Sequence, residues 1–521
     1  MCVPVTVTRR AALRGGLAGL GLAGLGAAGL TGCGGAPAST AIPEAGPAGP
    51  ARRGGRMVVA RPPASGAETL DPASSLSAYE YLGALYDRLV VLDDTGAAVP
   101  GLAESWESSP DARTWRFRLR RGVTFHHGRE LTAADAVHTL RRILDPATSS
   151  PMAGVFAGLL EPAGLSAPDP YTLQVALAKP AAELPSLLSG YQCGVLPASG
   201  EIGVGTGPFA LGGFTPAGRG SVTAHDDHWA GRPRLDEIAF ASVADAQART
   251  NALLAGQVHL LMQTNLDTAT ARVVASSPRT TVARSRNAQW YTVPMLATAA
   301  PFTDPVVRDA VRLAYDPQAV LDTAARDAGV VGGDNPVPPG QRDWVSTLRP
   351  RDPDRARSLL RRAGADGLEL DVYTSAYDPL FTPVAVAFAD SLADAGIRAR
   401  LVTAPADSYY TQVWMTRPLC VSYWFTGRPI DQLLNQIFRS GSSYNESAWA
   451  DPRFDAMLDA ARAETDAARR RTLYQDAQRY VAVHGSALTP MFADRLVGMS
   501  RDVRGYREHG FEFDYRGLGF A

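Results

Sequence analysis

Lysine is almost absent from this chain. Lys179 is the only lysine among 51 basic residues, so nearly all of the positive charge is carried by arginine. A phosphate-binding P-loop ends in Gly-Lys-Ser/Thr, and the sequence therefore contains no such loop. The Gly-x-Ser-x-Gly motif of many serine hydrolases and the His-Glu-x-x-His motif of zinc proteases are also missing. These absences argue against three large classes of enzyme.

Cysteine is scarce as well. The four cysteines, Cys2, Cys33, Cys193 and Cys420, show no Cys-x-x-Cys spacing, which argues against a zinc or redox centre. Cys193 and Cys420 can be buried free thiols or a disulfide, because sequence does not show whether they are close in space.

Histidine offers two candidate metal-binding pairs. His126 and His127 are adjacent, so their side chains point to different faces of an extended segment. His225 and His228 stand at i and i+3, which would place them on one face of a helix. We expect structural or exposed roles for all four residues and predict no metal site.

The chain carries no strong net charge. Its formal charge is −1, with 45% hydrophobic and 20% charged residues, which is typical of a soluble globular protein. A near-neutral chain is a poor partner for nucleic acid. About 465 residues follow position 55, too many for a single hydrophobic core, so two or more lobes are expected.

The N-terminal residues have the features of an export signal. Arg9-Arg10 precede a Gly/Ala/Leu run at residues 15–30, and Leu30-Thr31-Gly32-Cys33 resembles a lipobox. We predict a signal peptide over residues 1–33, exported by the twin-arginine or the general route, with Cys33 as the lipid attachment site. The alternative is an ordinary signal peptide with a chance cysteine. Residues 34–55, rich in Ala, Pro and Gly, are predicted to form a flexible tether.

The most informative segment is residues 101–142. Residues 114–120 (TWRFRLR) alternate apolar and basic side chains, which predicts a half-buried strand. Two Gly-containing turns follow, and Thr132 with Asp135 has the spacing of a capping box that opens a helix.

Residue by residue, the same segment resembles the family 5 extracellular solute-binding proteins of ABC importers. Those proteins typically read LA-x-SWE, then TW-x-F-x-LR-x-GV-x-FHDG-x-x-LTA-x-D. The matching residues here are Leu102, Ala103, Ser105, Trp106, Glu107, Thr114, Trp115, Phe117, Leu119, Arg120, Gly122, Val123, Phe125, His126, Gly128, Leu131, Thr132, Ala133 and Asp135. His127 departs from the usual Asp. Further similar stretches lie at residues 68–72, 81–90, 205–209, 228–238, 245–260, 301–310, 352–364, 444–447 and 466–478.

This resemblance implies an α/β, two-lobed periplasmic-binding-protein-like fold with mixed sheets. Lobe I would combine residues 56–100, 203–290 and 488–521, with residues 101–202 as an inserted subdomain. Lobe II would be residues 291–487, and a hinge between the lobes would close a ligand cleft. Independently, the pattern predicts a βαβ unit, with strands at residues 368–373 and 397–402 around a helix at 383–395.

The best binding candidate in the sequence is the strand end at residues 422–431. In peptide-binding relatives a W-x-G-D loop here supplies an acidic residue to the ammonium group of the ligand. This chain has Arg428 after Gly427, which favours an anionic or hydroxylated ligand over a free peptide amine. Two interpretations stay open: Arg428 lines the cleft or points to solvent, and Trp424 contacts ligand or belongs to the core. Tyr423, Phe425 and Asp431 complete this candidate loop, although Asp431 aligns better with a later Asp of the family that looks structural.

Other aromatic residues in loop or strand-end contexts are candidates for lining the cleft. Each can equally belong to the core. They are Tyr79, Tyr81, Trp290 and Tyr444, together with Tyr291, Tyr409 and Tyr410.

The resemblance therefore implies a binding protein that is not an enzyme and needs no cofactor. Its expected partners are a peptide-like or similarly sized solute, an ABC permease with its ATPase, and the membrane through a lipid anchor. We expect a monomer at the outer face of the cytoplasmic membrane or in the periplasm. The alternatives are a scavenger of metal complexes of the nickel type and a sensory lipoprotein, while a secreted hydrolase is disfavoured.

Overall fold

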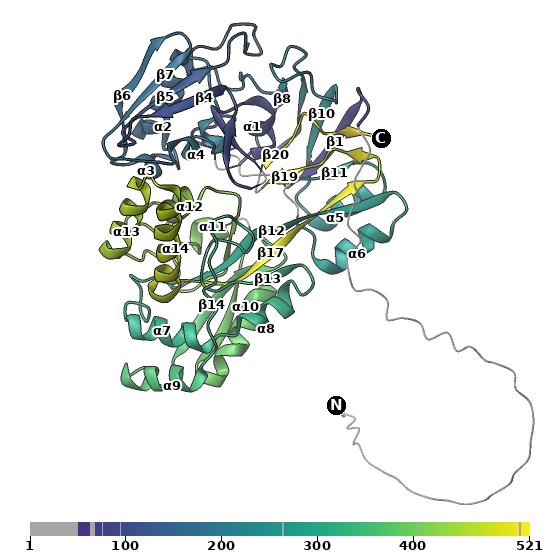
Figure 1. Cartoon of the computed structure of the whole chain (residues 1–521). Coiled ribbons are helices and arrows are strands. Elements are labelled where there is room, and N and C mark those ends of the chain that lie inside the picture. The colour runs from purple at the N-terminus through teal and green to yellow at the C-terminus, as the bar shows by residue number, and fades with distance from the viewer. Residues whose placement is uncertain are drawn as a thin grey trace, which may run out of the picture. The chain divides into compact units, whose positions relative to one another are not determined.

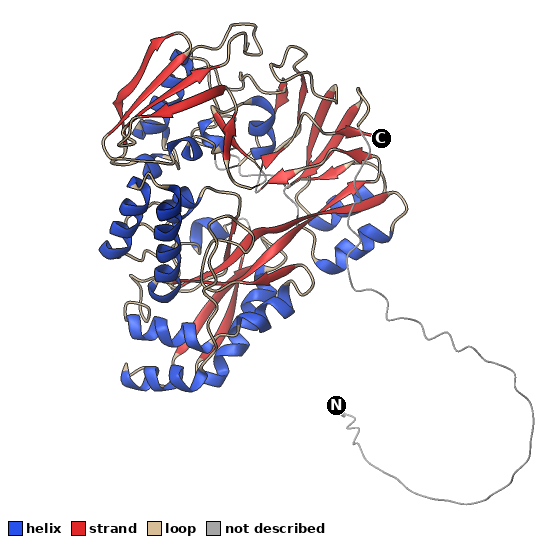
Figure 2. Ribbon diagram, in the orientation of Figure 1, coloured by secondary structure: helices blue, strands red, loops and turns tan. Residues whose placement is uncertain are grey.

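The computed structural model describes residues 51–62, 68–75, 77–93, 95–262, 265–406, 408–509 and 512–521 (Figure 2). These residues belong to one compact unit, Ala41–Ala521. The predicted signal peptide, the lipid site Cys33 and residues 34–50 of the predicted tether lie outside the described residues. Within the described part, no helix has the length and apolarity needed to cross a membrane.

Across the described residues the largest sheet has nine strands and mixes parallel with antiparallel pairs (Figure 1). Its order is β16-β12-β17-β11-β1-β10-β9-β8, and β13 pairs with β17. Strand β1 runs parallel to β10 and β11, and the other pairs are antiparallel. The strands are β1 (Arg56–Arg61), β8 (Phe209–Phe214), β9 (Gly220–Ala224), β10 (Glu237–Ser242), β11 (Leu260–Leu261), β12 (Thr280–Pro294), β13 (Gly329–Val331), β16 (Ser422–Phe425) and β17 (Ala487–Ser500).

A four-stranded sheet forms a separate layer, in the order β4-β5-β7-β6, with α2 (Ala133–Leu144) packed on it. Its strands are β4 (Ala103–Ser108), β5 (Thr114–Leu119), β6 (Leu160–Asp169) and β7 (Thr172–Leu177). The predicted alternation of β5 is confirmed, because Trp115, Phe117 and Leu119 are buried while the arginines between them are exposed. The capping box of α2 is confirmed as well: Thr132 N–H donates to Asp135 Oδ2 at 2.8 Å. One face of this sheet and helix α2 contribute to one hydrophobic core.

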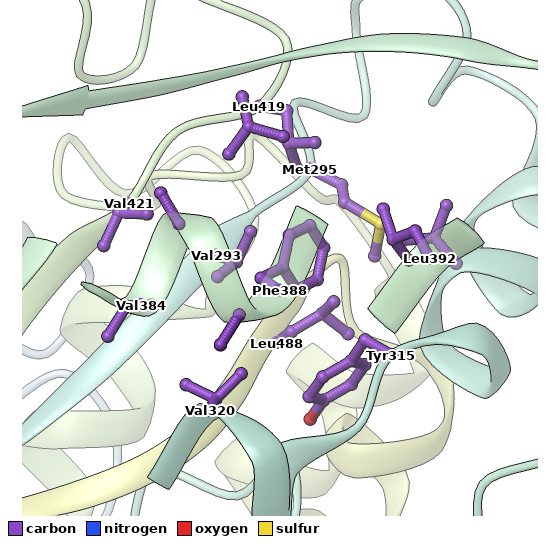
Figure 3. Packing of buried hydrophobic residues seen from close by; sticks show 14 of the residues in the cluster. Val293, Met295, Tyr315, Val320, Val384, Phe388, Leu392, Leu419, Val421 and Leu488 are labelled. Carbon is purple, nitrogen blue, oxygen red and sulfur yellow. The ribbon is translucent and has the colours of Figure 1, made fainter. Parts of the chain in front are cut away.

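The predicted βαβ unit is also confirmed. Strands β14 (Glu369–Ser375) and β15 (Arg398–Ala404) pair in parallel, and α10 (Phe381–Leu392) connects them and packs on both. Helices α7 (Pro305–Ala314), α8 (Pro317–Ala324) and α9 (Pro353–Arg362) add to the same core. Figure 3 shows Phe388 of α10 packed among Val293 of β12 and Leu488 of β17.

Strands β12 and β17 pass through more than one core. Val282 and Leu496 lie in a core with α5 (Ala246–Leu254) and α6 (Thr268–Ser276), whereas Val293 and Leu488 lie in the core of α7 to α10. Strand β12 spans the expected lobe boundary at residues 290–291, and β17 begins at Ala487, at the second expected boundary. The pairing of the two strands shifts register twice, between Ser285 and Gln289 and between Tyr291 and Val293, and Asn287 has a left-handed φ of 51°.

The remaining elements are short or lie outside these sheets. Helices are α1 (Tyr79–Leu85), α3 (Ala153–Phe156), α4 (Leu184–Leu187), α5 (Ala246–Leu254), α6 (Thr268–Ser276), α11 (Tyr409–Gln412), α12 (Ile430–Ile437), α13 (Pro452–Ala463) and α14 (Ala467–His484). The 3-10 turns are η1 (Pro146–Thr148), η2 (Tyr191–Cys193) and η3 (Ala393–Ala395). Small pairs are formed by β2 (Val90–Leu92) with β3 (Ala98–Pro100), β18 (Val503–Arg504) with β21 (Gly519–Phe520), and β19 (Glu508–His509) with β20 (Glu512–Phe513). We use "first lobe" for the elements from β1 to α6 and "second lobe" for those from α7 to α14.

Candidate functional site

Tyrosines of both lobes meet around one arginine. Tyr79 at the start of α1 and Tyr191 in η2 belong to the first lobe, and their ring centroids are 5.0 Å apart. Arg428 and Tyr444 belong to the second lobe. Burial raises the pKa of the Tyr79, Tyr191 and Tyr444 hydroxyls, and the positive charge of Arg428 opposes that rise for all three. The guanidinium group of Arg428 therefore lies close to aromatic residues of both lobes.

Arg428 is half-buried and held by its own loop. Its Cζ lies 5.6 Å from the centroid of the Trp424 ring, and its Nη1 donates to the carbonyl of Phe425. It also borders a pocket of about 60 Å³, which residues 95–98, Glu183 and Ser186 line from the first lobe. Residues 341–343 and 427–430 line the same pocket from the second lobe. The structure thus places Arg428 between the lobes, as a cationic group in tyrosine-rich surroundings.

A stack of tryptophans lies behind Arg428. Trp424 of β16 stacks on Trp290 of β12, with ring centroids 6.2 Å apart and planes 19° apart. Trp414, which sequence reasoning missed, packs edge-on against Trp424, and its Nε1 donates to the buried carboxyl of Glu446 at 2.8 Å. Trp290 has no exposed surface and is a core residue. Trp424 is buried in the same core but also carries Arg428 on its ring.

Tyr423 and Phe425 lie on the other face of β16. Tyr423 packs near Tyr291, which contacts a second charged residue, Asp378. The Tyr423 ring centroid lies 5.8 Å from that of Phe381 and 6.1 Å from that of Tyr291. Tyr291 O–H donates to Asp378 Oδ1 at 2.8 Å. Burial raises the pKa of the Asp378 carboxyl to about 6, against an ordinary value near 3.8.

Sequence reasoning overlooked Asp378 and its neighbour Tyr377. The signal was present, because Tyr377-Asp378-Pro379 comes just after strand β14. Polar and aromatic residues just beyond a strand often contact ligands.

Two sequence candidates lie away from this group. Asp431 is buried under α13 and α14, where Arg462 donates to both of its carboxylate oxygens and Tyr474 O–H donates to Oδ1 at 2.8 Å. Its carboxylate is therefore occupied within the second lobe. Tyr81 is fully buried in the first-lobe core, with its ring centroid 4.4 Å from that of Phe240, so the structure places it in the core instead of the cleft.

Histidines of both pairs form hydrogen bonds with the backbone of the first lobe. Gly205 N–H donates to His126 Nδ1 at 3.1 Å, and His126 Nε2 lies 3.1 Å from the carbonyl of Gly207. Burial lowers the pKa of His126 to about 4, so the ring is neutral at pH 7. His225 Nδ1 lies 3.2 Å from the same Gly207 carbonyl, and His228 pairs with Asp87. Among the described residues, no group of three or more His, Cys, Asp or Glu side chains is placed to hold a metal ion.

The structure distinguishes between the two states expected for Cys193 and Cys420, free thiols or a disulfide. Cys193 and Cys420 are both buried and free, and burial raises the pKa of the Cys193 thiol to about 12. Both thiols are therefore protonated at neutral pH.

Comparison with known proteins identifies the family. The model of the bacterial extracellular solute-binding proteins, family 5, matches residues 97–445, which is most of the chain. The chain belongs to this family. Its members serve ABC importers as solute-binding proteins, and the protein is accordingly a binding protein and not an enzyme.

Individual relatives agree over nearly the whole length. The dipeptide-binding protein of Pseudomonas aeruginosa is 26% identical over 482 residues, covering 84% of this chain and 90% of the relative. Two solved structures share the two-lobed fold. DppA of Helicobacter pylori in complex with the peptide STSA has a TM-score of 0.78 at 22% identity, over 90% of this chain and 98% of DppA. AgaA of A. tumefaciens R10 with agropinic acid has a TM-score of 0.77 at 24% identity, over 88% and 96%.

Proposed function

We propose that this protein is the extracytoplasmic receptor of an ABC importer, and that it captures a peptide-like or similarly sized solute between its two lobes. It would deliver the solute to a membrane permease that is driven by an ATPase. In this proposal the protein works as a monomer, anchored through a lipid on Cys33 at the outer face of the membrane or in the periplasm. The observation that carries the proposal is that Arg428 of the second lobe borders a pocket lined from the first lobe by Glu183 and Ser186.

Arg428 gives the proposed solute one of its features. A guanidinium group offers paired N–H donors that match a carboxylate in geometry and charge. Partial burial lowers the pKa of Arg428, but an arginine stays protonated at neutral pH, so a half-buried positive charge is maintained there. We therefore assign an anionic group of the solute to Arg428. Agropinic acid in AgaA is an example of an acidic ligand held by a protein of this fold.

Closure of the lobes would enclose the solute. Ion pairs already join the inserted subdomain to the second lobe, from Glu183 to Arg470 at 3.2 Å and from Lys179 to Asp459 at 3.5 Å. The first pair is largely buried, whereas the second is exposed and contributes little. The proposed hinge is the register shift of β12 and β17 near Asn287, because a bulge concentrates bending in two strands that both lobes share.

Thermal unfolding of the purified protein tests this proposal. The panel contains dipeptides and oligopeptides, acidic amino-acid conjugates, oligosaccharides and nickel complexes. A solute at a hundred times its Kd adds roughly 2.7 kcal/mol to the stability of the folded state, a clear rise in Tm. The proposal predicts such a rise with a peptide-like or acidic solute.

Arg428→Gln should abolish that rise while leaving the Tm of the free protein nearly unchanged. Arg400→Gln is the matched control, since Arg400 is exposed on β15 and pairs with the neighbouring Asp371. No rise with any member of the panel, or a rise that Arg428→Gln leaves intact, contradicts the proposal.

A further inference from the structure

Asn287 has a backbone conformation that residues with a side chain rarely adopt. It lies in strand β12 between Ser285 and Gln289, at a bulge where three residues of β12 lie opposite Asp494 of β17. Its φ is 51°, in the left-handed region. Asparagine tolerates this region better than most residues, but outside glycine it is uncommon and often marks a local role.

The side chain of Asp494 holds this bulge in place. Asn287 N–H donates to Asp494 Oδ1 at 2.8 Å, and Arg284 Nε donates to Oδ2 at 2.5 Å. Asp494 is 4% exposed, and Arg284 also donates to the carbonyl of Asp327 at 2.7 Å. One buried, ion-paired carboxylate therefore fastens both the strand before the bulge and the middle of the bulge itself.

The carbonyl groups of the bulge accept hydrogen bonds from the end of strand β16. Thr426 Oγ1–H donates to the carbonyl of Asn287 at 2.8 Å, and Thr426 N–H donates to the carbonyl of Ala288 at 2.9 Å. Residue pairing between β16 and β12 ends at Phe425 and Gln289. The two bonds from Thr426 therefore fasten the chain just beyond the paired part of β16.

The turn that carries Arg428 begins at this point. Gly427 has a φ of 83°, and Arg428 Nη1 donates back to the carbonyl of Phe425. The turn is thus short and closed on itself, and the bonds from Thr426 to the bulge form its base. The pocket between the lobes is bordered by Gly427 and Arg428. A shift of the Asn287 carbonyl would move Thr426 and, with it, Arg428.

We propose that Asn287 is a positioning residue for the solute site: its left-handed backbone, held by Asp494, determines through Thr426 where Arg428 stands. This inference rests on the proposed function and specifies how the same site is regulated. Because the bulge is also the proposed hinge, bending there would move Arg428 as the lobes close. A charged group that is held in place before binding loses less freedom when it binds, so the bulge would add to the affinity.

Two substitutions of Asn287 separate its backbone from its side chain. Asn287→Gly and Asn287→Ala both lose the hydrogen bond from Nδ2 to the carbonyl of Pro339, which is 3.3 Å long. Glycine adopts a positive φ freely, whereas alanine resists it. Asn287→Gly should therefore keep the bulge, and Asn287→Ala should disturb it.

Hydrogen–deuterium exchange of the solute-free protein measures this difference. After correction for intrinsic rates, the amides of residues 426–428 should exchange about 5- to 10-fold faster in Asn287→Ala than in Asn287→Gly, as expected for loss of one hydrogen bond. Thr426→Val removes the hydroxyl donor and should have the same effect as Asn287→Ala. Thr426→Ser keeps the hydroxyl and should not. Thr403→Val, an exposed change on β15, is the control.

The acidic dipeptide Ala-Glu is the probe for the effect on the site. Its affinity, measured by isothermal titration calorimetry, should fall about 5- to 10-fold in Asn287→Ala and Thr426→Val. The affinity should stay within about 2-fold of the unmodified protein in Asn287→Gly and Thr426→Ser, because both variants keep the bulge and its bond to Thr426. A residue that only stabilised the fold would lower Tm without this pattern of loss and rescue.

Equal exchange in Asn287→Ala and Asn287→Gly would overturn the inference. Faster exchange that leaves the affinity for Ala-Glu unchanged would overturn it as well, since Arg428 would then keep its place without the bulge. The exchange comparison uses no solute, so it decides the inference even if Ala-Glu does not bind, a result that concerns the proposed function alone. If Asn287→Ala folds poorly, the two Thr426 variants give the same comparison.

Discussion

Asp431 and Asp378 are both buried aspartates of the second lobe, and both lie at or just before the start of a helix. Asp431, 1% exposed, has Arg462 on both carboxylate oxygens and Tyr474 on one of them. Among the described residues, Asp378, 7% exposed, receives two neutral donors on one oxygen. The first carboxylate has a cationic partner in the described part of the protein, and the second forms no ion pair there. The difference teaches that pairing, more than burial, decides what a buried carboxylate does to the stability of the fold.

The two aspartates also differ in the elements around them. Asp431 joins α12 to α13 and α14, so its ion pair helps to fix three helices together. Such a pair adds little to stability over an apolar replacement, but breaking it leaves a buried charge alone. Asp378 lies in the loop between β14 and α10.

The largest change in the free energy of unfolding is expected from Asp431→Asn. This change leaves the buried Arg462 without its counter-charge and should lower the free energy of unfolding by about 3–5 kcal/mol. Urea unfolding followed by circular dichroism measures it. A loss below about 1 kcal/mol would contradict the structural role of Asp431.

Asp378→Asn should instead raise the free energy of unfolding at neutral pH. The folded-state pKa of about 6 lies above the ordinary 3.8, so the folded protein holds this proton more tightly. Asp378 therefore costs stability progressively as pH rises from about 4 to 7, by at most about 3 kcal/mol. The groups facing it are Arg495 and the tyrosines at positions 291, 377, 410 and 423. Burial raises the pKa of these tyrosines, so they stay neutral in this range.

Urea unfolding at pH 4.5 and pH 7 checks whether Asp378→Asn raises the free energy of unfolding. Asp378→Asn should be more stable than the unmodified protein at pH 7, with a smaller difference at pH 4.5. A variant that is less stable at pH 7 would show that Asp378 is well paired and would remove the contrast with Asp431.

The smallest changes in the free energy of unfolding are expected from two tyrosine variants. Tyr291→Phe and Tyr474→Phe each remove one neutral donor from a buried aspartate and should each cost about 1 kcal/mol. Tyr291→Phe should cost more at pH 7 than at pH 4.5, because ionised Asp378 loses one of its few donors. Tyr474→Phe should cost the same at both, since Arg462 still holds Asp431. Equal pH dependence in the two variants would count against the comparison.

Local features of the fold were predictable from sequence because their causes are local. Alternation along β5, the Thr132–Asp135 cap and the βαβ unit around α10 depend on residues near one another in the chain. The two aspartates were not predictable in this way. Arg462 and Tyr474 stand 31 and 43 residues from Asp431, and Tyr291 stands 87 residues from Asp378. Which carboxylate receives a cation is decided by tertiary packing, so the sequence leaves Asp431 open between a ligand contact and a structural role. For Asp378 it gives only the position of the residue just after a strand.

A crystal structure of the protein with its tightest-binding solute tests the account most directly. We predict the solute between the lobes, with its anionic group on the guanidinium group of Arg428. A solute bound elsewhere on the protein, or bound between the lobes without contact to Arg428, would contradict the account.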